Sequence, residues 1–145
     1  MSAHDGARAL SARVLVPGEG AAELLRLDAP LSFWGGVDPR TGRVVDPQHP
    51  QAGASLRGLA VALPGLRGST AGPGAMLECL VAGTAPAALL LTRDATVPFV
   101  AGFVAQFLGA PALPLAILDP ACPLERLSNG ARLIMAGATW RLEER

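Results

Sequence analysis

The chain has 145 residues, half of which are hydrophobic, and its 12 basic and 12 acidic residues give a formal net charge of zero. This size and apolar content predict one domain, spanning residues 1–145, with a single ordinary core. No excess of positive charge is present to attract nucleic acid or an anionic membrane, so neither is expected as a partner. All basic residues are arginines, which excludes a P-loop lysine and a Schiff-base lysine from this chain.

The first ten residues form a predicted polar arm without the apolar run of a signal peptide. The longest apolar stretches elsewhere are too short, and too interrupted by glycine and proline, to cross a bilayer. Cys79 and Cys122 have no second cysteine nearby, so they are predicted to be buried free thiols, as in a reducing cytoplasm. His4 and His49 lack the spacing of metal ligands, and no metal site is expected on this chain.

In chain order, the first predicted strand covers residues 13–16 and ends at a Pro-Gly-Glu-Gly turn at 17–20. A second strand is predicted over 23–28 because its residues alternate in polarity, and it would end at Ala29-Pro30, where the residue before proline disfavours the helical region. Residues 38–42 have the composition of a turn and lead into a short strand at 43–45, which predicts a hairpin. The whole stretch 32–53 has little regular periodicity, and such long loops usually bind ligands or partners.

Two aromatic residues and two glycines, Phe33, Trp34, Gly35 and Gly36, stand near the start of this long stretch. They could anchor a tight turn in the core, which is the commoner arrangement, or form the wall of a ligand cleft or a subunit interface. We take an interface or cleft as the functional hypothesis for these four residues and for His49, which lies farther along the same stretch.

A glycine-rich loop at residues 63–74, with the sequence LPGLRGSTAGPG, links a predicted strand at 59–63 to a predicted helix at 75–81 that Gly83 would end. Its four glycines let the backbone approach a ligand, and the helix would direct its unpaired N–H groups to the same place. Arg67, Ser69 and Thr70 add a cation and two hydroxyls, which suit a carboxylate, a phosphate or a stabilised serine oxyanion. A plain helix entry capped by Ser69 or Thr70 has the same composition.

The second half of the chain alternates apolar runs with helical patterns. Strands are predicted at 87–91 and 115–118, a helix at 97–108, and two strands over 131–142 that turn at Gly137. Phe99, Phe103 and Phe107 recur every four residues on one helix face, which we expect to be buried in the core. The order of elements predicts an α/β fold whose mixed sheet has 59–63, 87–91 and 115–118 as inner strands.

Six segments carry a family resemblance: PLSFWGGVDP at 30–39, TGR at 41–43, DPQHP at 46–50, LPGLRGST at 63–70, GTAPA at 83–87 and LDP at 118–120. They resemble the small, swivelling subunit of the aconitase X family, over nearly the whole chain. The resemblance implies a swivelling β/β/α domain like the mobile fourth domain of aconitase. It also implies a hydro-lyase (dehydratase) whose large subunit carries an iron or iron–sulfur centre, so that this chain binds no cofactor and is active only with that partner.

The resemblance also implies roles for the glycine-rich loop. The family's proposed proton acceptor is the serine of an Arg-Gly-Ser-Ser/Thr loop, which corresponds to Ser69, while Thr70 stands where a second serine is commoner. Arg67 would support Ser69 electrostatically, and Arg67, Gly68 and Thr70 would contact the substrate. Family substrates are cis-3-hydroxy-L-proline, which gives Δ1-pyrroline-2-carboxylate, and mevalonate 5-phosphate. The arginine-only composition is compatible with a GC-rich bacterial genome, so we expect cis-3-hydroxy-L-proline.

The chemistry of dehydration agrees with this mapping. It requires a base for the carbon-bound proton and a Lewis acid for the departing hydroxide, and this chain offers a candidate only for the base. It would therefore form half of an active site. A different class of protein, the swivelling phosphotransfer domain, needs a histidine in the glycine loop, and residues 65–74 contain none. A free-standing anion-binding module without chemistry would carry the same loop and stays an alternative, as does a mevalonate 5-phosphate dehydratase subunit.

Overall fold

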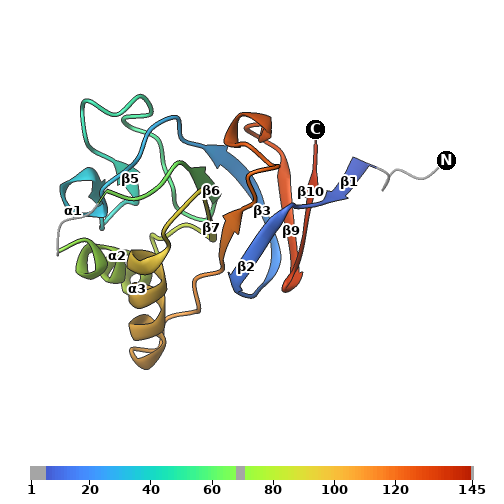
Figure 1. Cartoon of the computed structure of the whole chain (residues 1–145). Coiled ribbons are helices and arrows are strands. Elements are labelled where there is room, and N and C mark those ends of the chain that lie inside the picture. The colour runs from blue at the N-terminus through green and yellow to red at the C-terminus, as the bar shows by residue number, and fades with distance from the viewer. Residues whose placement is uncertain (1–5, 68–70, 145) are drawn as a thin grey trace.

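The computed structural model describes residues 6–67 and 71–144. In this part of the chain, eight strands form one sheet in the order β1-β10-β9-β3-β6-β7-β8-β2 (Figure 1). These strands are β1 Ala7–Ala9, β2 Ala12–Val16, β3 Gly18–Arg26, β6 Ala60–Leu63, β7 Ala88–Leu91, β8 Leu115–Leu118, β9 Arg132–Gly137 and β10 Thr139–Glu143. The other elements are the hairpin strands β4 Val37–Asp38 and β5 Arg43–Val44, and the helices α1 Phe33–Gly36, α2 Gly72–Ala82, α3 Thr96–Phe107 and η2 Leu124–Arg126.

Four strands at the centre of the sheet, β3, β6, β7 and β8, run parallel to one another. Every residue of β6 and of β7 is buried, because both faces of these strands are covered, and this is why their sequences are continuous apolar runs. The three predicted inner strands are therefore confirmed to within one residue. The predicted hairpin is confirmed as well, since β4 and β5 pair antiparallel.

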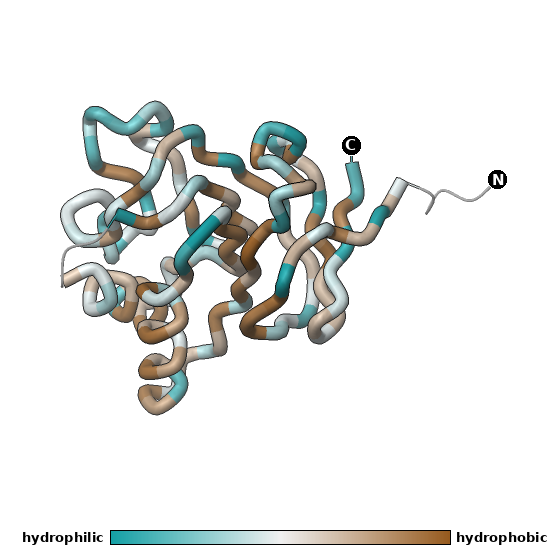
Figure 2. Tube along the Cα trace, viewed as in Figure 1, coloured by the Kyte–Doolittle hydropathy of each residue, from teal (hydrophilic) through white to brown (hydrophobic). Residues whose placement is uncertain are grey.

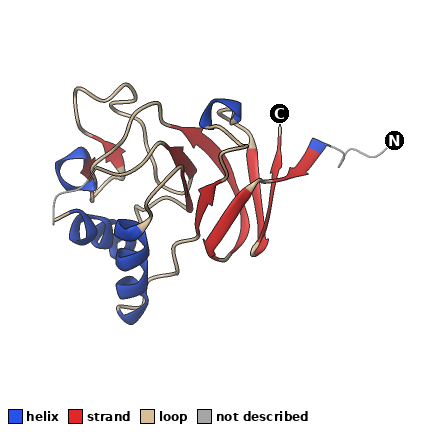
Figure 3. Ribbon diagram, in the orientation of Figure 1, coloured by secondary structure: helices blue, strands red, loops and turns tan. Residues whose placement is uncertain are grey.

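The central strands present two different faces to two cores. Leu63, Leu89 and Leu91 belong to a core that α2 and α3 cover with residues such as Met76 and Ala101. The alternate positions of the same strands, which are mostly alanines, belong to a second core that β9 and β10 close. Figures 1 and 3 show α2 and α3 on one side of β6 and β7, and β9 and β10 on the other. This is the predicted β/β/α arrangement.

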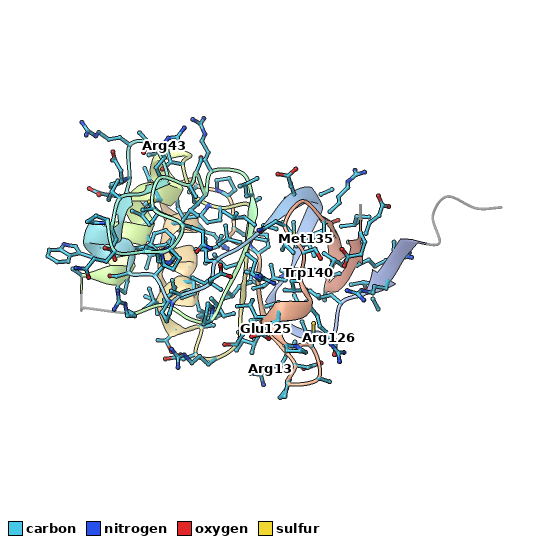
Figure 4. All side chains as sticks on the ribbon, turned by 90° about the horizontal axis from the view of Figure 1, so that it is seen from above. Arg13, Arg43, Glu125, Arg126, Met135 and Trp140 are labelled. Carbon is cyan, nitrogen blue, oxygen red and sulfur yellow. The ribbon has the colours of Figure 1, made fainter. Side chains whose placement is uncertain are left out.

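Trp140 is the largest side chain of the second core and is buried. It is the register partner of Met135 on the neighbouring strand, and Figure 4 shows the two residues lying together. The indole N–H of Trp140 donates a hydrogen bond to the carbonyl of Gly137 at 3.0 Å. Gly137 has a φ of 66° at the turn between β9 and β10, which confirms the turn predicted there.

The face of α3 that packs on the sheet is not the predicted one. Phe99, Phe103 and Phe107 are 47%, 57% and 77% exposed, so the prediction that they are buried is wrong. The buried face consists of small residues instead, namely Pro98, Ala101, Gly102 and Ala105. A β-carbon built on Gly102 would lie 3.3 Å from Cβ of Leu113, so the helix approaches its neighbours closely along this face. The larger side chains are left outside, and the tube of α3 in Figure 2 is brown to tan over much of its length.

Strand β3 is longer than its hydrophobic pattern predicts. It begins at Gly18, inside the stretch whose composition indicates a turn, and its first residues pair with β9. A β-carbon on Gly18 would lie 2.5 Å from Cγ of Pro114, so glycine is required there for space. The predicted polar arm likewise contains β1, which pairs with β10.

Helix α2 begins three residues earlier than predicted and ends, as expected, before Gly83, which has a φ of 77°. Pro73 stands in the first turn of α2, where its missing N–H costs no hydrogen bond within the helix. No helix among residues 6–67 and 71–144 combines the length and the apolar character that a membrane span requires.

Candidate functional site

Three segments that are distant in sequence meet where the parallel strands end. The first is the aromatic loop, residues 31–36, which comes after β3, and the second is the glycine loop, residues 63–74, which contains the end of β6. The third is residues 92–94, which follow β7 directly. In sheets with parallel strands, ligands bind beyond the carboxyl ends of the strands, so this edge is the candidate site.

Leu31 joins the aromatic loop to the glycine loop through the backbone. Its N–H donates a hydrogen bond to the carbonyl of Gly65 at 3.3 Å, and its carbonyl accepts one from the N–H of Arg67 at 2.9 Å. Leu31 and Leu66 form an isolated parallel bridge, which extends the sheet by one residue pair beyond β3 and β6. These contacts place the aromatic loop and the start of the glycine loop on one edge of the domain.

Asp46 brings the long loop that follows β5 to the same place. Its Oδ2 lies 3.8 Å from Nη2 of Arg67, while its Oδ1 accepts a hydrogen bond from the N–H of Gln48 at 2.9 Å. The Arg67 side chain is mostly exposed, so this ion pair orients the guanidinium more than it stabilises the fold. Arg67 thus stands at the surface of the glycine loop with its charge available to a ligand.

The amino end of α2 follows the glycine loop directly. Its N-terminal cap, Ala71, supplies no side-chain cap, and the first turn contains no acidic residue. The N–H groups of that turn and the positive end of the helix dipole therefore favour an anion nearby. Ser69, Gly68 and Thr70, to which we assign catalysis and substrate contact, lie outside the described residues. Their roles stay predictions.

The aromatic loop divides into a buried and an exposed part. Phe33 and Gly36 are buried, Phe33 being only 3% exposed, whereas Gly35 is exposed and Trp34 is 61% exposed. Gly35 has a φ of 77°, and the Ser32 hydroxyl donates a hydrogen bond to the Trp34 carbonyl at 3.0 Å, so a tight turn projects the indole outward. Of the two alternatives for this loop, Phe33 fits the core anchor, and Trp34 keeps the interface or cleft hypothesis.

His49 is also buried, with an exposed fraction of 6%. Its Nε2 lies 3.1 Å from the carbonyl of Ala29, and its Nδ1 accepts a hydrogen bond from the N–H of Gln51 at 3.0 Å. The Nε2 contact joins the long loop to the segment after β3, whereas the Nδ1 hydrogen bond lies within the long loop itself. His49 is thus packed against the segment after β3, and its assignment to an interface or cleft stays a prediction.

Sequence reasoning missed the residues that follow β7. The Thr92 hydroxyl donates a hydrogen bond to the carbonyl of Pro64 in the glycine loop. The side chain of Arg93 lies against Gly65, because a β-carbon built on that glycine would be 2.7 Å from Nε of Arg93. Asp94 accepts a hydrogen bond from the N–H of Thr96 at 2.9 Å, and its hydrogen bonds with Thr96 lower the pKa of its carboxyl group. Their position immediately after a buried strand was the signal that could have found them.

Both cysteines are free. Cys79 is buried in α2, and burial raises the pKa of its thiol, against a smaller lowering by its hydrogen bond with Thr84. Cys122 is only partly buried, so the prediction of burial holds fully for Cys79 alone. Within the described residues, no group of three or more His, Cys, Asp and Glu side chains is arranged to hold a metal ion.

Comparisons with known proteins agree with this geometry. A family model described as the aconitase X swivel domain matches residues 9–143. The cis-3-hydroxy-L-proline dehydratase of Pseudomonas aeruginosa is 40% identical over 139 residues, which are 92% of this chain and 24% of that protein. The phosphomevalonate dehydratase small subunit of Methanosarcina acetivorans is 30% identical over 134 residues, which are 92% of this chain and 89% of that subunit. The chain thus spans about a quarter of the bacterial dehydratase it matches.

Solved structures show the same fold. The holo-form of aconitase X from Thermococcus kodakaraensis superposes with a TM-score of 0.78 and 25% identity, over 95% of this chain and 98% of that one. A UPF0107 protein solved by NMR superposes with a TM-score of 0.77 and 25% identity, over 95% of this chain and 99% of that one. The match therefore includes both the helical layer and the layer formed by β9 and β10.

Proposed function

Because the chain belongs to the aconitase X swivel domain family, we propose that it is the small, swivelling part of a hydro-lyase that dehydrates a hydroxy acid. The observation that carries this proposal is the junction of the glycine loop, the aromatic loop and Asp46 at the amino end of α2. It supports the proposal because the segment before the serine carries a cation, Arg67, and the segment after it begins a helix. Relatives named as dehydratases support the reaction class.

In the proposed reaction, the chain contributes the proton acceptor. Ser69 would take the carbon-bound proton, and the amino end of α2 together with Arg67 would stabilise its oxygen as an anion. A serine hydroxyl is a weak base in water, so this stabilisation is a requirement of the proposal. Gly68 and Thr70 would contact the substrate, and Arg67 would also bind its carboxylate.

The family resemblance implies an iron or iron–sulfur centre, and the described residues do not suit one. No group of three or more donor side chains is assembled among them, and the Cys79 thiol is enclosed in the helical core. In our proposal, the large subunit carries the centre, as the family resemblance implies. The chain would contribute a base and charged groups to an active site that is completed across an interface.

Exposed apolar side chains support the existence of that partner. Trp34 projects from the aromatic loop, and α3 presents Phe99, Phe103 and Phe107 to solvent. Exposed apolar patches of this kind commonly mark interaction surfaces. The bacterial dehydratase contains a further three quarters of its length beyond the matched region, and other relatives are named small subunits. A large subunit, encoded separately or fused, would cover these side chains.

Both cysteines are free, so a cytoplasmic location stays our expectation.

The proposed substrate is cis-3-hydroxy-L-proline, which would give Δ1-pyrroline-2-carboxylate. The 40% identity to a bacterial enzyme with this name, over 92% of the chain, favours it over mevalonate 5-phosphate. The small subunits named for phosphomevalonate match at 30% identity when the alignment is similarly complete. The second candidate stays mevalonate 5-phosphate, because several small subunits with that name match.

The test is reconstitution with the large subunit encoded nearest to this chain. The purified complex should dehydrate cis-3-hydroxy-L-proline, whereas the isolated chain and the isolated large subunit should be inactive. If the complex turns over only mevalonate 5-phosphate, the proposed substrate is wrong but the proposed reaction class still holds. If the complex forms but dehydrates neither compound, while the isolated chain binds anions tightly, the non-catalytic anion-binding module is the better description.

A further inference from the structure

The guanidinium group of Arg93 occupies the space where Gly65 would carry a side chain. A β-carbon on Gly65 would lie 2.7 Å from Nε of Arg93 and 3.4 Å from both its Cγ and its Nη2. Gly65 is not among the glycines with a positive φ, so its backbone conformation is open to other residues. Glycine at this position therefore leaves space for the Arg93 side chain. With any other residue at position 65, the guanidinium group would have to move away from the backbone of the glycine loop.

Arg93 and Arg67 differ in whether a carboxylate lies beside the guanidinium group. Arg67 lies 3.8 Å from the carboxylate of Asp46, whereas Arg93 forms no ion pair with any described residue. Its neighbour Asp94 is engaged at the start of α3 by Thr96. Arg93 is exposed and lacks an acidic partner among the described residues, so its charge attracts an anionic group, and the planar guanidinium matches the two oxygens of a carboxylate.

Space for such a group is present beside Arg93. The residue lines a hollow of about 650 Å³ at the edge of the sheet, and exposed Arg13 from β2 lines the same hollow. Asp94 lines it as well, with its Oδ1 accepting hydrogen bonds from Thr96, so two arginines face one carboxylate there. Arg13 also forms no ion pair among the described residues. Arg93 thus stands between this hollow and the glycine loop, where a ligand could reach its guanidinium from solvent.

We propose that Arg93 is a second substrate-binding residue of this site, which binds the carboxylate of the substrate, and that Gly65 keeps the space its guanidinium needs. The proposal rests on the proposed dehydratase function. In it, Arg67 contacts the carboxylate from the loop that contains Ser69, and Arg93 contacts it from the segment that follows β7. Two cations from different strands would orient the substrate better than one, because each fixes a different direction.

Kinetics of the reconstituted complex with cis-3-hydroxy-L-proline test the proposal. Arg93→Gln should raise KM by about tenfold or more and change kcat much less, since the contact is made in both the ground state and the transition state. Arg93→Lys should bring KM part of the way back to the wild-type value, because lysine restores the positive charge but lacks the two parallel N–H donors of a guanidinium group. The matched control is Arg132→Gln on β9, which removes another exposed arginine that forms no ion pair among the described residues, and it should change neither constant.

Gly65→Ala provides a second route to the same result. The added methyl group should displace the guanidinium and raise KM as Arg93→Gln does, and the double variant should be no worse than Arg93→Gln alone. Additive effects of the two changes, at unchanged thermal stability, would contradict the role given to Gly65. A KM for Arg93→Gln within about twofold of the Arg132→Gln control overturns the proposal.

A binding measurement separates this inference from the proposed function. Calorimetric titration of the complex with L-proline, L-prolinamide and inorganic phosphate needs no turnover. Arg93→Gln should weaken binding of L-proline about tenfold and leave prolinamide, which lacks the carboxylate, unaffected. If the complex is inactive but this pattern holds, the function is wrong and the carboxylate site stands. If the wild-type complex does not distinguish L-proline from prolinamide, or if only phosphate binding depends on Arg93, the carboxylate proposal is overturned.

Discussion

The N–H of Arg67 donates a hydrogen bond of 2.9 Å to the carbonyl of Leu31, which joins two loops separated by more than thirty residues of sequence. Leu31 is buried, and its own N–H is bound to the carbonyl of Gly65. The exposed Trp34 and the charged Arg67 are therefore attached to one short, buried backbone bridge. A partner that contacts Trp34 would act directly on the position of the glycine loop.

Replacement of Ser69 by alanine tests the proposed base. In the reconstituted complex, Ser69→Ala should lower kcat by at least about a hundredfold, because positioned acid–base groups contribute at least this much. Assembly and thermal stability should stay near wild type, since a lost cap costs on the order of 1 kcal/mol. Steady-state kinetics with analytical ultracentrifugation measures both. Near-normal turnover would make Ser69 a helix cap and move the base to the partner.

Replacement of Trp34 by alanine tests the interface. Trp34→Ala should weaken assembly with the large subunit by at least about tenfold, because exposed tryptophans are frequent interface anchors. The melting temperature of the isolated chain should change little, since the indole is 61% exposed. The control is Trp140→Ala, which empties a buried position and should cost about 3–5 kcal/mol of folding free energy. Equal destabilisation by both changes would contradict the assignment of Trp34.

The outer face of α3 gives a separate prediction about assembly. Phe103→Ser should leave the isolated chain folded, because this side chain is 57% exposed, and should make it less prone to self-association. In the complex, it should lower the affinity for the large subunit, as measured by surface plasmon resonance. An unchanged affinity would show that α3 is not covered by that partner. Its neighbour Gln106→Ser removes an exposed polar side chain of the same helix and serves as the control.

Two glycines with different surroundings give opposite stability predictions. Gly18→Ala should destabilise the fold by about 1–3 kcal/mol, because the new methyl group would overlap Pro114. Gly74→Ala, inside α2 with no atom within 4 Å of the added carbon, should be neutral or stabilising by up to about 1 kcal/mol. Urea unfolding measures both changes. A loss of stability at Gly74 equal to that at Gly18 would contradict this steric account.

Burial of Cys79 predicts a pH dependence of stability. Because burial raises the pKa of this thiol in the folded chain, the unfolded chain ionises first as the pH rises. The contribution of Cys79 is therefore fully present below the ordinary pKa of a thiol and is lost as the pH rises toward the raised value. Cys79→Ala should remove this part of the alkaline decrease in unfolding free energy.

Thiol labelling provides an independent check of the same burial. In the native chain, Ellman's reagent should react readily with Cys122, which is only partly buried, and slowly with Cys79. Both thiols should react at once in denaturant. Fast native labelling of a Cys122→Ser variant would show that Cys79 is accessible and would contradict the placement of α2 over the sheet.

Local patterns identified most of the regular structure. The inner strands were predictable because a strand covered on both faces must be apolar at every position, as in β6 and β7. Gly83 and Gly137 were predictable because their positive φ angles favour glycine whatever the surroundings are. Gly18 misled the same reasoning, since it is needed for its distance to Pro114 and not for a turn.

The sequence by itself determined the order of the inner strands and of the two long helices, the glycine loop with its serine and arginine, and the family motifs, because these depend on neighbouring residues. Only the tertiary structure decided which face of α3 is buried, because close approach of the helix selected Ala101, Gly102 and Ala105 over the phenylalanines. It also decided that Phe33 and His49 are enclosed and that Arg93 lies on Gly65. These outcomes depend on contacts between segments that are distant in the chain, and local sequence patterns carry no information about such distances.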